Sequence, residues 1–257
     1  MPAAAAHHSL ARGAATIAYR RSEGTTPGVI FLGGFHSEMN GNKATALESW
    51  AGAKGCAYVR FDYQGHGASS GRFEDGAIGT WADDALAVLD GATQGPQVLV
   101  GSSMGGWIAL LLALKRPERV AALVGVAAAP DFTEDLILPR LDETARAAVF
   151  RDGVWHRPSA YGSDPYPITR RLIEEARGHL LLRGPIPVRC PVRLIHGMRD
   201  PDVPWRTSLR LIECLEGDDA RLTLVKDGDH RLSRPEDLIL LERTIGTVLD
   251  EVQESSR

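Results

Sequence analysis

The stretch Gln97-Val98-Leu99-Val100-Gly101-Ser102-Ser103-Met104-Gly105-Gly106-Trp107 joins two apolar runs through a turn rich in glycine and serine. Residues 97–100 are typical of a short buried strand. Residues 107–114 are typical of a buried helix, which must end before Pro117. The pattern G-x-S-x-G between a strand and a helix predicts a sharp turn that exposes a nucleophilic serine.

Two neighbouring serines compete for the apex of this turn. The turn strains its apex residue and crowds the residues two before and two after it, so these must be nearly without side chains. Ser103 has Gly101 and Gly105 at those places, whereas Ser102 has a valine and a methionine there. We therefore predict Ser103 as the nucleophile, at a helix start whose free N–H groups favour negative charge.

A serine hydroxyl needs an adjacent base, and the base needs an orienting group. In hydrolases with this turn, the acid and then the histidine follow the nucleophile along the chain. Asp200 and Asp202 follow a predicted strand that ends at Ile195, and His230 follows one that ends at Val225. We predict His230 as the base and Asp200 as the acid, because Asp200 lies nearer its strand. Asp202 is the alternative acid, and otherwise a helix cap or turn residue.

Stabilising the oxyanion of such a reaction requires two fixed N–H donors. The residue after the nucleophile supplies one, which is the amide of Met104. The second is expected from the loop after the strand that ends at Leu32, where two glycines permit close approach. We predict the Phe35 amide as this donor, with His36 as the alternative polar contact at the mouth of the site.

Other polar residues near these strand ends are predicted to play structural parts. Asp227 and Asp229 flank the base and are expected at the loop surface. His66 lies in a glycine-rich loop in which Asp62 suits a tight turn, and His196 is expected to hold the turn that bears the acid. No group of residues has metal-ligand spacing and no loop has phosphate-binding spacing, so neither a metal nor a cofactor is expected.

Alternating strand and helix patterns predict an α/β fold with a mostly parallel central sheet and helices on both faces. The alternation fails over residues 130–187, which we predict to be a helical lid inserted over the carboxyl ends of the strands, with helices near 133–150 and 168–182. The other predicted strands are 15–20 (at the sheet edge), 28–32, 56–61, 97–100, 120–126, 190–195 and 221–225, and the helices are 41–54, 81–89, 103–115, 205–215 and 236–252.

Composition excludes several classes of protein. The chain of 257 residues has a formal net charge of −4 and no block of like charge, so no nucleic-acid partner is expected. Its uncharged apolar stretches are too short to span a bilayer. Cys56, Cys190 and Cys214 lack C-x-x-C spacing, which argues against a disulfide scaffold and fits a reducing compartment.

The N-terminal residues differ from the rest of the chain. Residues 1–13 are rich in alanine and lack the apolar core of a secretory signal, so we expect a flexible tail before a domain over 14–257. A remnant of a transit peptide is the alternative. The expected location is the cytoplasm.

The chain resembles one family along almost its whole length, and five segments carry the resemblance. The chain resembles the α/β-hydrolase fold and, more narrowly, the family of the mitochondrial acyl-glucuronide esterase and palmitoyl-protein thioesterase. The Met-Asn-Gly-x-Lys-Ala run and the His-Gly-Met-x-Asp run that ends in Val-Pro-Trp are its most specific motifs. The segments are 34–44, 60–71, 100–107, 189–205 and 229–231. The resemblance implies the same triad of Ser103, Asp200 and His230, and residues 130–187 match it only in patches.

These observations predict a serine hydrolase of carboxylic esters or thioesters, acting through an acyl-enzyme. Its substrate is expected to be a small ester or thioester or an acylated protein, and the oligomeric state stays open. The alternatives are a C–C bond hydrolase or aminopeptidase with the same triad, and a binding protein without activity. A dehalogenase is disfavoured because its turn carries aspartate. Five arginines of the predicted lid either clamp an acidic leaving group or lie on solvated faces: Arg140, Arg146, Arg157, Arg170 and Arg171.

Overall fold

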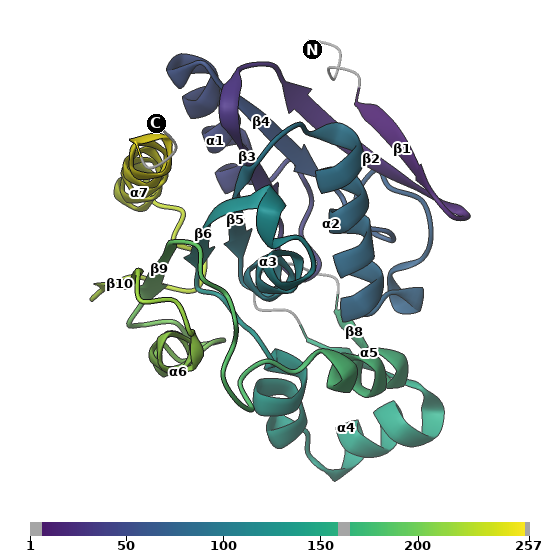
Figure 1. Ribbon diagram of the computed structural model, residues 1–257. Coiled ribbons are helices and arrows are strands. Elements are labelled where there is room, and N and C mark those ends of the chain that lie inside the picture. Colours follow the sequence, from purple (N-terminus) through teal and green to yellow (C-terminus); the bar gives the residue numbers. More distant parts are fainter. Residues whose placement is uncertain (1–6, 159–164, 255–257) are drawn as a thin grey trace.

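The computed structural model describes residues 7–158 and 165–254 and contains an eight-stranded sheet (Figure 1). The strand order is β1-β2-β4-β3-β5-β6-β9-β10, in which β1 and β2 pair antiparallel to their neighbours and the other pairs are parallel. The predicted mostly parallel sheet is therefore confirmed. The strands are β1 His8–Arg12, β2 Ala15–Ser22, β3 Thr25–Leu32, β4 Cys56–Phe61, β5 Gln97–Ser102, β6 Val120–Val126, β9 Val192–Gly197 and β10 Ala220–Val225.

The predicted flexible tail over residues 1–13 is wrong for residues 8–12, which form the edge strand β1. This strand pairs with β2 from His8–Tyr19 to Arg12–Ala15, so β2 is not the edge. An ion pair between Arg12 and the buried Asp84 also holds it. The strand has no alternating apolar pattern, because backbone pairing and this ion pair hold it, so sequence alone gave no strand signal. Residues 1–6 lie outside the described part of the chain.

Helices cover both faces of the sheet, as predicted. Their apolar side chains form two clusters with the strands, one on each face. Helices α1 (Asn42–Lys54) and α7 (Pro235–Glu254) cover one face, and α2 (Ile78–Ala92), α3 (Met104–Lys115) and α6 (Arg206–Cys214) cover the other (Figure 1). Within the described residues, every helix is too short or too polar to cross a membrane.

The segment 130–187 falls between β6 and β9 in the chain, and its described residues lie at one end of the sheet (Figure 1). Short helical turns, including α4 (Glu143–Ala147), replace the single helix predicted near 133–150. The helix predicted near 168–182 is shorter, since α5 covers Arg170–Ala176. The strands β7 (Val154–Arg157) and β8 (Tyr166–Thr169), which pair antiparallel, were not predicted, because their pairing joins residues 9–15 positions apart and leaves no local pattern.

The two ends of this segment meet at one buried carboxylate. Asp131, which is fully buried, accepts hydrogen bonds from the amides of Leu181 and Leu182 at 2.7 and 2.8 Å. Asp131 has a φ of 59°, a value that aspartate tolerates better than most residues. The segment is thereby fixed next to the carboxyl ends of β5, β6 and β9, where the predicted site residues also lie.

Candidate active site

Ser103 occupies the apex of the turn between β5 and α3, in a backbone conformation that is rare for a residue with a side chain. Its φ and ψ are 54° and −117°. The turn is tightly packed, because a Cβ on Gly101 would lie 2.4 Å from the Gly105 carbonyl oxygen, and one on Gly105 would lie 2.1 Å from the Leu32 oxygen. Only glycine fits at either place. The turn predicted from the sequence is present with Ser103, not Ser102, at its apex.

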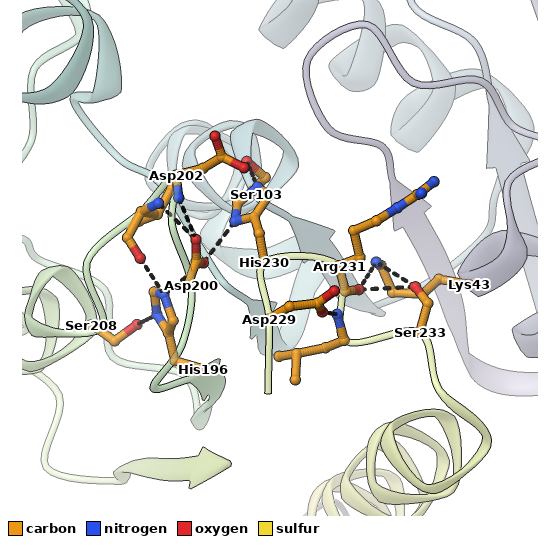
Figure 2. Close-up of polar contacts among 12 residues, drawn as sticks. Lys43, Ser103, His196, Asp200, Asp202, Ser208, Asp229, His230, Arg231 and Ser233 are labelled. Atoms are coloured by element: carbon orange, nitrogen blue, oxygen red, sulfur yellow. Dashed lines mark hydrogen bonds and ion pairs between the residues drawn. The ribbon is translucent and has the colours of Figure 1, made fainter. Parts of the chain in front are cut away.

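His230 contacts both other members of the predicted triad (Figure 2). Its Nε2 lies 3.1 Å from Ser103 Oγ, and its Nδ1 lies 2.7 Å from Asp200 Oδ2. The three side chains come from loops after β5, β9 and β10, which end at the same edge of the sheet. With Nε2 as the acceptor, the Ser103 hydroxyl donates to His230, and the Nδ1–H donates to Asp200.

The Asp200 carboxylate is fully buried and has several donors. Its Oδ1 accepts from the amides of Asp202 and Val203, both at 2.8 Å, and its Oδ2 also lies 3.2 Å from His196 Nε2. Burial alone would raise the pKa of Asp200, but the hydrogen bonds from His196 and His230 outweigh it and hold the pKa well below its usual range. Asp200 is therefore a carboxylate at neutral pH.

A second contact fixes His196 beneath this carboxylate. The His196 ring is fully buried, and its Nδ1 lies 2.7 Å from Ser208 Oγ in α6 (Figure 2). Its Nε2 also lies 3.0 Å from the Val203 carbonyl oxygen. His196 thus holds the turn that bears Asp200, as predicted. Ser208 was not predicted from the sequence, because it lies on a separate helix.

The side chains of the other three acidic residues considered from the sequence are not part of the hydrogen bonds that join the predicted triad. Asp202 does not cap α6, which begins at Arg206; its amide donates to Asp200, and its carboxylate lies 3.5 Å from Arg157 Nη2. Asp227 is exposed and pairs with Arg234. Asp229 is also at the surface.

The loop after β3 lies against Ser103. A Cβ on Gly34 would be 3.5 Å from Ser103 Cβ. In the described part of the chain, the backbone N–H of Phe35 donates to no other residue. Met104 follows Ser103 as the first residue of α3. His36, the alternative to Phe35, is exposed and places its ring 5.1 Å from that of Tyr166.

A cavity of about 560 Å³ opens over Ser103 and His230. Its lining differs in polarity, because residues 130–187 contribute mostly apolar side chains, whereas residues 38–43 and 230–233 contribute mostly polar ones. The apolar wall includes Phe35, Phe132, Leu136, Ile137, Tyr166, Ile168 and Val203. The polar wall includes Glu38, Asn42, Lys43, Arg231 and Ser233.

The five arginines considered as a clamp divide into two groups. Arg140 and Arg157 line the cavity, and Arg140 donates to the Asp202 carbonyl oxygen at 3.0 Å. The other three are described residues that lie outside the cavity lining: Arg146, Arg170 and Arg171. A sequence count of arginines could not separate these groups, because the separation depends on how the segment folds.

One group of residues in the site has the composition of a metal site. Asp200, Asp202 and His230 offer ligand atoms that lie within 4.8 Å of one another, among the residues that the structure describes. However, His230 Nδ1 and Asp200 Oδ2 already bond to each other. A metal ion there would compete with the contact that orients the histidine, so the geometry favours proton transfer instead.

Lys43 lines the polar wall and has no role that was predicted from the sequence. The residue lies within the Met39–Ala44 run that carries the resemblance. Its contacts reach residues almost 190 positions away, so they could not be read from local pattern. The only indication in the sequence that Lys43 has a role was its place in a motif that is specific to the family.

Comparisons with known proteins identify the family and the fold of the chain. The chain matches the family model described as the alpha/beta hydrolase fold over residues 29–172. It is 44% identical over 239 residues to a Bos taurus protein named "Palmitoyl-protein thioesterase ABHD10, mitochondrial", with 92% of this chain and 77% of that protein covered.

Two solved structures resemble the whole chain. A putative hydrolase from Agrobacterium vitis S4 has a TM-score of 0.90 and 42% identity, covering 95% of this chain and 98% of that one. Mouse alpha/beta hydrolase domain-containing protein 10 has a TM-score of 0.89 and 41% identity, covering 96% and 100%. The family and the fold predicted from the sequence are confirmed.

The expected cytoplasmic location is wrong by the same comparison. Relatives from Bos taurus, Mus musculus and Homo sapiens are all named as mitochondrial. The expectation rested on unpatterned cysteines, which indicate a reducing environment, and on N-terminal residues that lack the apolar core of a secretory signal. Because more than one compartment is reducing, these signals could not distinguish the cytoplasm from the mitochondrion.

Proposed function

This chain belongs to the α/β-hydrolase fold family, in the group that includes the ABHD10 palmitoyl-protein thioesterases, and we propose that it hydrolyses thioesters and carboxylic esters through Ser103, His230 and Asp200. One observation carries the proposal: the His230 ring bridges Ser103 Oγ at 3.1 Å and Asp200 Oδ2 at 2.7 Å. A serine hydroxyl is a weak nucleophile at neutral pH, and this contact supplies the base that it needs.

The reaction proceeds in two halves. Ser103 Oγ attacks the acyl carbon while His230 Nε2 takes its proton, and His230 then returns the proton to the leaving thiol or alcohol. Water repeats the sequence on the acyl-enzyme and releases the acid. Asp200, whose pKa is held low, keeps the Nδ1–H oriented and stabilises the imidazolium that forms.

The oxyanion of each half needs donors on the side of the acyl carbon away from His230. The amides of Met104 and Phe35 are the donors in this proposal. Its support is the position of Met104 at the start of α3 and the close approach of Gly34 to Ser103. Donors fixed in a site of low polarity stabilise the developing charge more than water does.

The two walls of the cavity suggest how a substrate lies. Residues 130–187 act as a lid in this proposal, and their apolar side chains receive the acyl chain. The leaving group then faces the polar wall and the solvent. A long apolar chain buried against Phe132, Ile137 and Ile168 gains roughly 0.8 kcal/mol for each buried methylene.

The two adjacent serines provide a direct test. Hydrolysis of p-nitrophenyl esters and of acyl thioesters of graded chain length is measured for the wild type, Ser103→Ala and Ser102→Ala. We expect Ser103→Ala to lower kcat by about 10⁴-fold or more, and Ser102→Ala to have an effect of a few-fold at most. Full activity of Ser103→Ala, with an intact fold by circular dichroism, would reject the proposal.

The alternatives give different results in the same experiments. A C–C bond hydrolase or an aminopeptidase would leave both ester and thioester series almost unhydrolysed while Ser103 still reacts with a fluorophosphonate. A binding protein without activity would fail to react with the fluorophosphonate as well. Labelling of Ser103 is therefore measured alongside turnover.

A further inference from the structure

The Met39–Ala44 run has no part in the mechanism above, yet one of its residues contacts the histidine loop. Lys43 is the second residue of α1, and its Nζ donates to the carbonyl oxygen of Arg231 and lies 3.3 Å from Ser233 Oγ. Figure 2 shows Lys43 and Ser233 beside Arg231, on the side of the loop away from Asp200. We propose that Lys43 is a positioning residue that fixes the loop bearing His230, an inference that rests on the proposed role of His230 as the base.

The loop contains a strained residue between the two that Lys43 contacts. Leu232 is 2% exposed and has a φ of 42°, in the left-handed region that residues with a side chain seldom adopt. Such a conformation persists only where several contacts determine it. Lys43 contacts the residue on each side of Leu232, and Asp229 accepts the Leu232 amide at 2.9 Å.

The start of α1 gives Lys43 a rigid base, because buried groups of β4 and the loop after it hold the segment. Arg60 donates to the Met39 carbonyl oxygen at 2.6 Å, and Asp62 accepts the Met39 amide at 2.6 Å. Both charged residues are nearly inaccessible, at 3% and 1% exposure. Asp62 also accepts the amide of Ala68, so the predicted turn role of Asp62 is confirmed. A displacement of the loop at Arg231 and Ser233 relative to α1 therefore breaks the contacts of Lys43.

The charge of Lys43 makes these contacts dependent on pH. Burial, followed by the nearby Arg231 guanidinium, lowers the pKa of Lys43 to about 8, against the opposing carboxylates of Asp229 in the same loop and Asp237 in α7. An ammonium donor makes a stronger hydrogen bond to a carbonyl oxygen than a neutral amine does. The hydrogen bonds from Lys43 to the loop are therefore strongest below pH 8, and they weaken as Lys43 loses its proton at higher pH.

Three variants test the role of the side chain. Lys43→Met removes the donor and keeps the stem, Lys43→Arg keeps a donor that stays charged, and Lys54→Met changes an exposed lysine at the other end of α1. The measurements are kcat and KM for a neutral p-nitrophenyl ester from pH 6 to 10, the rate of labelling by a fluorophosphonate, and thermal unfolding. Ser103→Ala is measured in parallel to test the proposed function itself.

We expect Lys43→Met to lower kcat by about 10- to 100-fold at pH 7 with KM within twofold, since small displacements of a catalytic group cost this much. Fluorophosphonate labelling slows by the same factor, and Lys54→Met matches the wild type. The wild type loses kcat above pH 8, whereas Lys43→Arg retains activity there. If Lys43→Met does not fold, the pH profiles of the wild type and Lys43→Arg decide.

Other outcomes overturn the inference and separate it from the proposed function. An unchanged kcat in Lys43→Met, or a raised KM at constant kcat, shows that Lys43 does not position the base. Identical alkaline profiles of the wild type and Lys43→Arg lead to the same conclusion. If Ser103→Ala is inactive in those cases, only the role of Lys43 fails; if Ser103→Ala is active, the proposed function fails as well.

Discussion

The carboxylate of Glu175 in α5 accepts a hydrogen bond from the backbone N–H of Gly79 in the first turn of α2, and its two oxygens lie 3.0 and 3.1 Å from the Gly79 nitrogen. Helix α2 begins after Ala77, which has no side chain that could satisfy these amides. The segment at residues 130–187 thus supplies a cap to a helix of the main sheet. Glu175 also lies 2.8 Å from His179 Nε2, and the carbonyl oxygen of His179 accepts the Trp107 indole N–H at 2.9 Å.

Glu175→Ala is therefore expected to lower the free energy of unfolding by about 1–2 kcal/mol, the usual cost of losing a helix cap. Glu174→Ala is the matched control, because Glu174 lies in the same helix and pairs only with the exposed Arg170 at the surface among the described contacts. Its loss should be within about 0.5 kcal/mol. Urea denaturation measures both, and equal losses would show that the contact with Gly79 contributes nothing.

The choice between Asp200 and Asp202 as the acid can be decided by two amide substitutions. Asp200→Asn keeps an oxygen for the amides of Asp202 and Val203, but removes the charge that stabilises the imidazolium of His230. We expect kcat to fall by about 10³- to 10⁴-fold with little change in KM. Asp202→Asn leaves the backbone contact unchanged and is expected to lower kcat by less than about tenfold. Steady-state kinetics on one p-nitrophenyl ester tests both, and the reverse order would make Asp202 the acid.

Sequence patterns predicted those strands and turns whose structure is determined by neighbouring residues. The strand Val120–Val126 has the bounds that its apolar run predicts, because a buried parallel strand must be apolar throughout. The turn at Ser103 was predictable because only glycine fits two residues to either side. Since the carboxyl ends of parallel strands share one edge, Asp200 and His230 could be expected near this turn.

Elements that depend on contacts between distant residues could not be predicted from sequence patterns. Strands β7 and β8 depend on pairing with each other, and strand β1 depends on pairing with β2 and on the ion pair of Arg12 with Asp84. The contact between Lys43 and Arg231 joins opposite ends of the chain. Each of these depends on the folded arrangement, whereas the patterns that predict helices and strands extend over a few residues.

Buried His66 should make the protein sensitive to acid. Its ring is 4% exposed and lies among the rings of Tyr63, Phe73 and Trp81, with centroids 4.9–5.6 Å apart. Burial lowers the pKa of His66 to about 4, although its contact with the Gln64 carbonyl opposes the shift. The unfolded chain therefore binds this proton below about pH 6.5, whereas the folded chain does not bind it until about pH 4. Stability is present above this window and is lost as the pH falls through it.

His66→Phe is expected to remove this part of the acid sensitivity. Between pH 7.5 and pH 5, the free energy of unfolding of the wild type should fall by roughly 2 kcal/mol more than that of the variant. His156→Phe changes an exposed histidine and is the control, and its free energy of unfolding should fall as much as that of the wild type. Urea denaturation at the two pH values measures each difference. The same loss in His66→Phe and the wild type would mean that His66 does not titrate in this way.

Two glycine-to-alanine substitutions are expected to have opposite effects on stability. A Cβ on Gly105 would lie 2.1 Å from the Leu32 carbonyl oxygen and 2.6 Å from that of Gly33. These are backbone atoms at the end of a central strand and cannot withdraw, so Gly105→Ala should cost more than about 3 kcal/mol and displace Ser103. Gly52 lies inside α1 with nothing within 4 Å of its Cβ position, so Gly52→Ala should stabilise by about 0.5–1 kcal/mol. Urea denaturation with fluorophosphonate labelling measures both effects, and wild-type stability of Gly105→Ala would show that the turn is not closely packed.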